Sequence, residues 1–145
     1  MVRLERITED NYKECLNLKV RADQESFVSS NAHSLAKAYV YYHIVTPFAV
    51  YEDDIMVGFM LIRFNERFCN YFIWQFMIDE RYQGRGYGKE AMILAINWMK
   101  TDERCKEIVL TYKEGNECAE KLYTQLGFVR LNDIEDGEID MVLRY

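Results

Sequence analysis

The spacing of apolar residues divides the first half of the chain into a strand and two helices. Residues 2–7 alternate between apolar and charged side chains, which predicts a half-buried strand. Apolar residues then recur at helical spacing over 12–20 and again over 35–42. Ser30 is a suitable N-terminal cap for the second helix, and Pro47 is expected to close that helical segment.

After the proline the pattern changes to that of strands. Residues 48–51 and 55–64 flank an acidic turn at 52–54, which predicts a β-hairpin. Residues 71–78 are nearly all apolar. A strand that is apolar on both faces is buried on both faces, so this strand is expected at the centre of the sheet.

The second half of the chain adds two helices and three strands. The pattern predicts, in order, a helix that ends near Lys100, a strand at 107–112, a helix at 117–125 stopped by Gly127, and a final hairpin of strands 128–131 and 140–143. The full order is β-α-α-β-β-β-α-β-α-β-β. It predicts an α/β fold in one domain, residues 1–145, with a mixed sheet and helices on both faces.

Composition narrows the class of protein. Half of the residues are apolar and 14% are aromatic, as in a chain with a packed core. The net charge of −6 argues against a nucleic-acid surface. We find neither an apolar stretch long enough for a bilayer nor a leader pattern, so the expected location is the cytoplasm. His33 and His43 have no partner at metal-ligand spacing, so no metal site is expected.

The stretch 77–88 carries the clearest chemical signal. An apolar strand ends at Ile78, and Gly84, Gly86 and Gly88 then precede a helical pattern. Glycines before a helix let backbone N–H groups converge on one point, and the helix dipole adds positive partial charge there. The spacing differs from the dinucleotide fingerprint and from a nucleoside-triphosphate P-loop. The stretch therefore predicts a site for another phosphate-bearing ligand.

Two motifs resemble a known family. Gln83-Gly84-Arg85-Gly86-Tyr87-Gly88 resembles the Q/R-x-x-G-x-G/A signature of the GNAT superfamily of acyl-CoA-dependent N-acetyltransferases. A second cofactor element of that superfamily resembles Asn116-x-x-Ala119-x-x-x-Tyr123-x-x-x-Gly127-Phe128. The predicted order of elements agrees with the superfamily over nearly the whole chain.

The resemblance implies a role for each cofactor-side residue. The pyrophosphate of acetyl-CoA would bind the backbone amides of Gln83, Gly84, Arg85, Gly86, Tyr87 and Gly88. The strand edge at Met77 and Ile78 would pair with the pantetheine arm, beside a splay from the strand at 109–111. Asn116 would hydrogen-bond the arm. Tyr123 would face the sulfur and, being protonated at neutral pH, would give the leaving thiolate a proton.

The acceptor side is less defined. The stretches Asp23-Gln24-Glu25-x-Phe27-Val28 and Pro47-Phe48-Ala49-Val50-Tyr51 resemble bacterial spermidine/spermine (diamine) acetyltransferases. Trp74, however, stands where characterised polyamine enzymes carry a carboxylate. Glu25 is the substitute candidate for the catalytic base. Phe27, Tyr51 and Trp74 are candidates for an aromatic wall around a cationic substrate. An acidic cluster could also steer a polycation; it comprises Asp133, Glu135, Asp136, Glu138 and Asp140.

The expected function is therefore transfer of acetyl from acetyl-CoA to a primary amine by direct attack, with spermidine and spermine as candidate acceptors. Other acceptors stay open, among them a protein N-terminus, a lysine, an amino acid or an aminoglycoside. A non-catalytic acetyl-CoA-binding domain is a further alternative. A homodimer is also possible, because an edge strand in the C-terminal hairpin could pair with a second subunit.

Overall fold

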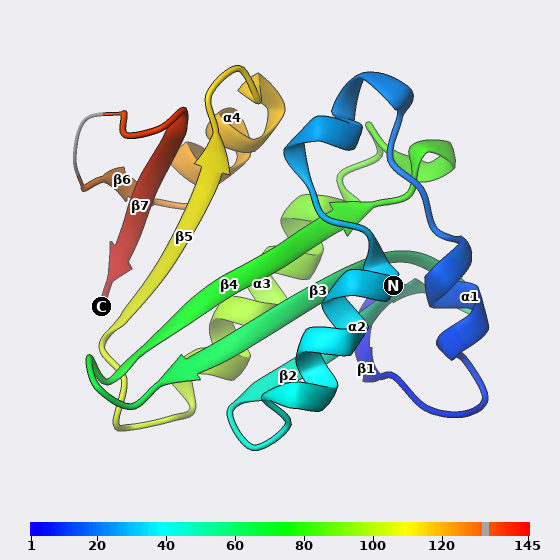
Figure 1. Cartoon of the computed structure of the whole chain (residues 1–145), viewed down its shortest axis with the longest axis horizontal. Coiled ribbons are helices and arrows are strands. Elements are labelled where there is room, and N and C mark those ends of the chain that lie inside the picture. The colour runs from blue at the N-terminus through cyan, green and yellow to red at the C-terminus, as the bar shows by residue number, and fades with distance from the viewer. Residues whose placement is uncertain (132–133) are drawn as a thin grey trace.

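A computed structural model describes residues 1–131 and 134–145. Within these residues seven strands form one sheet in the order β1-β2-β3-β4-β5-β7-β6, with helices on both faces (Figure 1). The strands are β1 (Val2–Arg6), β2 (Val45–Glu52), β3 (Ile55–Asn65), β4 (Asn70–Ile78), β5 (Glu107–Lys113), β6 (Val129–Arg130) and β7 (Glu138–Arg144). The α-helices are α1 (Tyr12–Asn17), α2 (Asn31–Val40), α3 (Tyr87–Lys100) and α4 (Glu117–Gln125), and the 3-10 helices are η1 (Ala22–Phe27) and η2 (Glu80–Tyr82). The predicted order of strands and α-helices is confirmed.

The sheet separates two apolar layers. On one face, α3 buries Ala91, Ala95 and Met99 against the central strands. On the other face, α1 and α2 cover a second cluster that includes Cys15 and Phe59. In Figure 1, α1 and α2 lie in front of the sheet and α3 lies behind it. None of the helices in the described ranges is long and apolar enough to span a bilayer.

Two sequence expectations about the first half need correction. Pro47 does not close α2, because that helix ends at Val40 and Pro47 lies inside β2, opposite Leu61 of β3. Pairing of β2 with β1 stops at Phe48, so Pro47 has a neighbouring strand on one side only and its missing N–H is tolerated.

The first helix is also shorter than its apolar pattern predicts. It ends at Asn17, and the backbone N–H of Lys19 donates to the carboxylate of Asp79, 3.0 Å away. This tertiary hydrogen bond holds the chain after α1 in an extended conformation at Leu18, so the helix cannot continue to residue 20.

The two central strands separate because of a β-bulge. β4 and β5 are parallel and pair only from Tyr71 to Ile73. Directly after Ile73, Trp74 is the extra residue of a bulge against β3, since Ile73 pairs with Ile62 and Gln75 with Leu61. A bulge bends its strand, and β4 turns away from β5 from this point on. Figure 1 shows the two strands diverging from a shared lower end, as the predicted splay requires.

Candidate active site

Two cavities open at the splay between β4 and β5. The first, of about 320 Å³, is bordered by the end of β4, the glycine loop, η1 and α4; we call it the loop cavity. The second, of about 300 Å³, lies over the bulge between β4, β5 and α2; we call it the Trp74 cavity. Phe27 and Val28 border both cavities, so the two spaces meet at the end of η1.

The glycine loop presents a free helix N-terminus to the loop cavity. Gly84 and Gly86 have φ angles of 77° and 84°, in the left-handed region. Gly86 is the N-terminal cap of α3, and no side chain caps this end of the helix. A Cβ atom at Gly86 would meet nothing within 4 Å, so the space beside the loop is open. The first N–H groups and the dipole of a 14-residue helix therefore make this point suitable for an anion.

Side-chain hydrogen bonds hold the loop in place. The amide of Gln83 donates to the carbonyl oxygen of Ile78 at 2.8 Å and exchanges two hydrogen bonds with the amide of Gln24, at 2.9 and 3.2 Å. Gln24 belongs to η1. The pair therefore joins the start of the glycine loop to the segment that separates the two cavities.

Asp79 anchors the junction between β4 and the loop. Its side chain is 1% exposed and accepts hydrogen bonds from the backbone of Lys19 and from both the backbone and the guanidinium of Arg81. Burial acts to raise the pKa of this carboxyl, but the hydrogen bonds from Arg81 and Lys19 outweigh it and hold the pKa below its ordinary value. Asp79 is therefore ionised in the folded protein at neutral pH.

α4 places a buried phenol at the inner end of the loop cavity. The side chain of Asn116 caps the helix by accepting from the N–H of Ala119 at 3.2 Å, which leaves its NH₂ group free to donate. Two turns further on, Tyr123 is 8% exposed and lies between the rings of Tyr112 and Phe128, with centroids 6.2 and 5.9 Å away. Burial raises the pKa of Tyr123 well above its usual value. The phenol is therefore a proton donor at any physiological pH.

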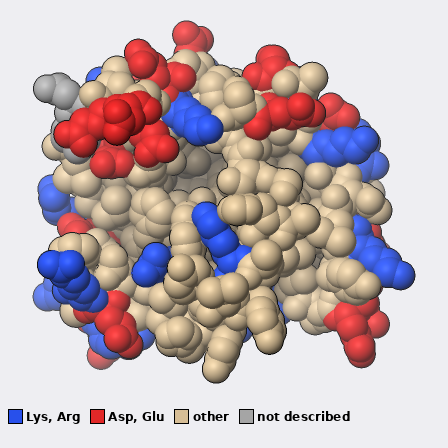
Figure 2. Space-filling view, in the orientation of Figure 1, with Lys and Arg blue, Asp and Glu red and all other residues tan. Residues whose placement is uncertain are grey.

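Aromatic and basic side chains form the Trp74 cavity. Its lining includes Phe27, Lys37, Trp74, Tyr112, Lys113 and Glu138. Lys113 donates to the carbonyl oxygen of Ser26 at 2.6 Å, which ties β5 to η1 across the splay. The hydroxyl of Tyr112 is buried and has no hydrogen-bond partner among the described residues. Figure 2 shows basic side chains bordering the hollow at the centre of this face, with acidic side chains above it.

Most of the residues expected on the cofactor side lie together. The loop cavity is lined by Met77, Ile78, Gln83, Gly84, Gly86, Tyr87, Gly88, Asn116 and Tyr123. Arg85 is exposed and does not border the cavity; its guanidinium lies 5.7 Å from the ring centroid of Tyr82.

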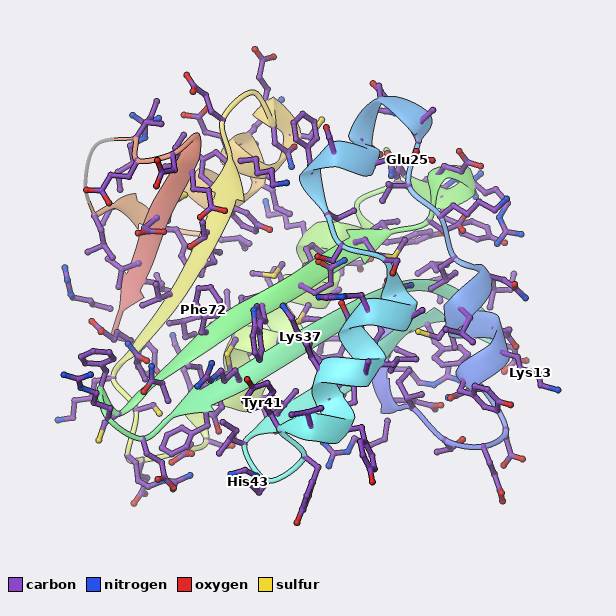
Figure 3. The ribbon with its side chains drawn as sticks, in the orientation of Figure 1. Lys13, Glu25, Lys37, Tyr41, His43 and Phe72 are labelled. Carbon is purple, nitrogen blue, oxygen red and sulfur yellow. The ribbon has the colours of Figure 1, made fainter. Side chains whose placement is uncertain are left out.

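The expected acceptor residues are only partly brought together. Phe27 and Trp74 share the Trp74 cavity, but Tyr51 does not join them, because it is buried at the end of β2 under Arg3, 4.7 Å from its ring centroid. The three-membered aromatic wall is therefore not formed. Glu25 is exposed on η1 and borders a third hollow near α1 instead of either cavity (Figure 3). Its carboxylate is thus not placed beside Tyr123 at the loop cavity.

One residue of the acidic cluster in the last hairpin borders the Trp74 cavity. Glu138 borders the Trp74 cavity, while Asp140 accepts from the hydroxyl of Thr111 at 2.5 Å. Glu135 and Asp136 lie in the exposed turn before β7, and Asp133 lies outside the described residues.

Three residues at the cavities were not predicted from sequence. The contact of Gln24 with Gln83 carried no local signal, because the two residues are 59 positions apart. Lys37 lies on a helix face whose environment is set by tertiary packing. Tyr112 was predicted within a strand, and the alternation of β5 puts it on the same face as the buried Ile108 and Leu110. For Tyr112, the alternation along β5 was the sequence signal that could have predicted its burial.

Together the splayed parallel strands, the uncapped helix and the apolar cleft define a site for an extended, phosphate-bearing ligand. Residues 5–128 match the family model described as Acetyltransferase (GNAT) family. The spermine/spermidine N(1)-acetyltransferase of Bacillus subtilis strain 168 is 33% identical, over 97% of this chain and 97% of that protein. The chain belongs to the GNAT acetyltransferase family and is an N-acetyltransferase.

Solved structures share the fold at low identity. The spermidine N-acetyltransferase of Vibrio cholerae, solved with CoA and spermine, superposes with a TM-score of 0.79 at 17% identity, over 99% of this chain and 95% of that one. Aminoglycoside acetyltransferase AAC(6')-Ib, solved with coenzyme A, gives the same TM-score, identity and coverage. The two structures have different acceptors in their names, so the fold alone does not define the acceptor.

Proposed function

We propose that this chain transfers the acetyl group of acetyl-CoA to a primary amine and that the acceptor is a polyamine such as spermidine or spermine. One observation carries the proposal: a single cleft has a free helix N-terminus at one end and the buried phenol of Tyr123 at the other. The polyamine part is supported by the 33% identical relative, which is a spermine/spermidine acetyltransferase and matches over nearly its full length.

The loop cavity fits acetyl-CoA. The N–H groups around Gly86 and Gly88 would hold the pyrophosphate, because a Cβ atom at Gly84 or Gly86 would meet nothing within 4 Å and the loop is open there. Within the described residues, β5 pairs with β4 only as far as Ile73, so the edge of β4 at Met77 and Ile78 is open to an amide-bearing arm. The carbonyl oxygen of Ile78 already accepts from the side chain of Gln83. The NH₂ group of Asn116 would donate to the same arm.

Tyr123 would act as the general acid. When bound, acetyl-CoA supplies an acetyl group activated as a thioester. The acceptor amine attacks directly, and the departing thiolate takes the phenolic proton of Tyr123. The raised pKa keeps that proton in place, and the aromatic rings of Tyr112 and Phe128 fix the direction of the side chain.

The amine must lose its own proton before it attacks. An alkyl amine with a pKa of about 10.4 is about 3.4 units too basic at pH 7, which corresponds to about 4.6 kcal/mol. No carboxylate borders the loop cavity among the described residues, so we propose that water in the open cleft takes this proton. The rate should then rise with pH toward the pKa of the amine, with no falling limb from Tyr123.

An assay of thiol release with a panel of amines tests the proposed acceptor. Spermidine and spermine should be acetylated with a higher kcat/KM than an amino acid, an aminoglycoside or a peptide N-terminus. Turnover of one of these other amines, without turnover of either polyamine, would overturn the polyamine part and leave the N-acetyltransferase activity intact.

A further inference from the structure

Trp74 holds two cations of the protein against its ring. The ammonium of Lys37 lies 4.2 Å from the ring centroid, and the guanidinium carbon of Arg63 lies 5.1 Å from it. Lys37 comes from α2 and Arg63 from β3. Neither cation forms a salt bridge with a carboxylate of the described residues. The contact that the described residues make with the Lys37 ammonium is therefore the π face of Trp74, in place of an ion pair.

The ring that holds Lys37 faces a cavity that could admit an acceptor. Trp74, Lys37 and Phe27 all line this cavity. An aromatic face attracts the charge of an ammonium group. In this structure the ammonium on the ring is that of Lys37.

We infer that Lys37 determines acceptor specificity by occupying, on Trp74, the place of a distal ammonium group of the acceptor. This inference rests on the proposed function and adds to it that the amine enters from the Trp74 cavity, which meets the loop cavity at Phe27 and Val28. A polycation must displace the Lys37 ammonium or bind next to it, and each further charge on the acceptor adds repulsion. Lys37 therefore favours acceptors with few charges over acceptors with many.

The expected change in binding follows from the repulsion between the Lys37 ammonium and an ammonium group of the acceptor in a partly solvated cleft. At a separation of about 7 Å and an effective dielectric constant of about 40, their repulsion corresponds to roughly a 5- to 10-fold change in binding. Salt screens such charges over about 8 Å at physiological ionic strength, so the effect should shrink as salt is added. A singly charged amine has no second ammonium near Trp74 and should be affected about twofold or less.

The test compares Lys37→Gln with wild type on spermine, spermidine and a singly charged alkylamine of spermidine's length. We expect kcat/KM to rise about 5- to 10-fold for spermine, less for spermidine and least for the monoamine. Lys37→Arg keeps the charge and should resemble wild type. Lys13→Gln is the matched control, because it removes the same charge from the exposed surface of α1, away from the cleft (Figure 3).

A binding measurement separates this inference from the proposed function. In a Trp98→Phe background Trp74 is the remaining tryptophan, so its fluorescence reports spermine binding without turnover. Tighter spermine binding after Lys37→Gln supports the inference even if no polyamine is acetylated, an outcome that overturns the proposed acceptor alone. Equal binding with and without Lys37 overturns the inference. Weaker binding also overturns it, since Lys37 would then hold an anionic or neutral part of the acceptor.

Discussion

The two cavities at the splay are built from different parts of the chain. The phosphate end of the loop cavity is backbone from one continuous stretch, the end of β4 and the glycines before α3, while η1 and α4 complete the lining. The Trp74 cavity is made of side chains from η1, α2, β4 and β5, which are far apart in the sequence. A backbone site depends on conformation, whereas a side-chain site depends on which residues tertiary packing brings together. This difference explains why the cofactor can be inferred more firmly than the acceptor.

The largest effect on activity is expected from a substitution of Tyr123, at the inner end of the loop cavity. Tyr123→Phe removes the phenolic proton but keeps the ring between Tyr112 and Phe128. We expect kcat to fall by about 10²- to 10³-fold, because general acid catalysis contributes on that order, while the KM for acetyl-CoA stays nearly constant. Steady-state kinetics over pH 6–10 check this. A mutant with wild-type kcat across that range would remove Tyr123 from the mechanism.

Two glycine-to-alanine substitutions test whether acetyl-CoA binding depends on the backbone conformation of the glycine loop. Gly86→Ala places a Cβ at a φ of 84°, which costs about 1–2 kcal/mol in the conformation that aims the N–H groups. We expect acetyl-CoA to bind about 10-fold more weakly, measured by titration calorimetry. Gly137→Ala is the matched control, with a φ of 75° in the turn before β7. Similar losses of affinity in both variants would mean that Gly86 acts only through global stability.

The same contrast decides how much of the structure could be read from the sequence. Period and turn chemistry predicted every strand and α-helix, and the motif at 83–88 predicted the helix N-terminus found there. The prediction that Pro47 closes the second helix was wrong, because only tertiary structure shows that Pro47 lies in β2 just beyond the pairing with β1. Tyr51 was grouped with Trp74 as an aromatic residue, and Glu25 was chosen because its segment lines the acceptor pocket in the superfamily that the chain resembles. Packing put both outside the Trp74 cavity. No local pattern could have placed Lys37 on the ring of Trp74.

Substitution of Asp79 tests whether a residue outside the lining of the loop cavity stabilises the junction between β4 and the glycine loop. Its depressed pKa means that its stabilising contribution is present above the usual carboxyl pKa of about 4 and is lost as the pH falls through the lower folded value. Asp79→Asn should lower the free energy of unfolding by about 2 kcal/mol at pH 7, and the difference from wild type should narrow below about pH 4.

Denaturant titrations at several pH values measure this difference. Asp53→Asn is the control, because Asp53 is exposed in the turn after β2 and should change stability by no more than about 0.5 kcal/mol. A gap between Asp79→Asn and wild type that stays constant down to pH 3 would contradict the assigned ionisation.

The smallest effect should come from the link between the two cavities. Gln24→Leu removes both hydrogen bonds to Gln83 and frees η1, which carries Phe27 into the Trp74 cavity. Since one hydrogen bond contributes about 1 kcal/mol net, we expect the KM values for acetyl-CoA and for the amine each to rise about 3- to 5-fold. Gln125→Leu, at the exposed end of α4, is the control. A rise in only one of the two KM values would show that η1 does not couple the cavities.

The most direct measurement is a crystal structure of the protein with CoA and spermine. We predict that pyrophosphate oxygens lie about 3 Å from the backbone nitrogens around Gly86 and Gly88, with the sulfur next to the hydroxyl of Tyr123. We also predict that an ammonium of spermine lies on Trp74, with Lys37 displaced from its ring. CoA bound away from the glycine loop, or a sulfur out of reach of Tyr123, would contradict the proposed function.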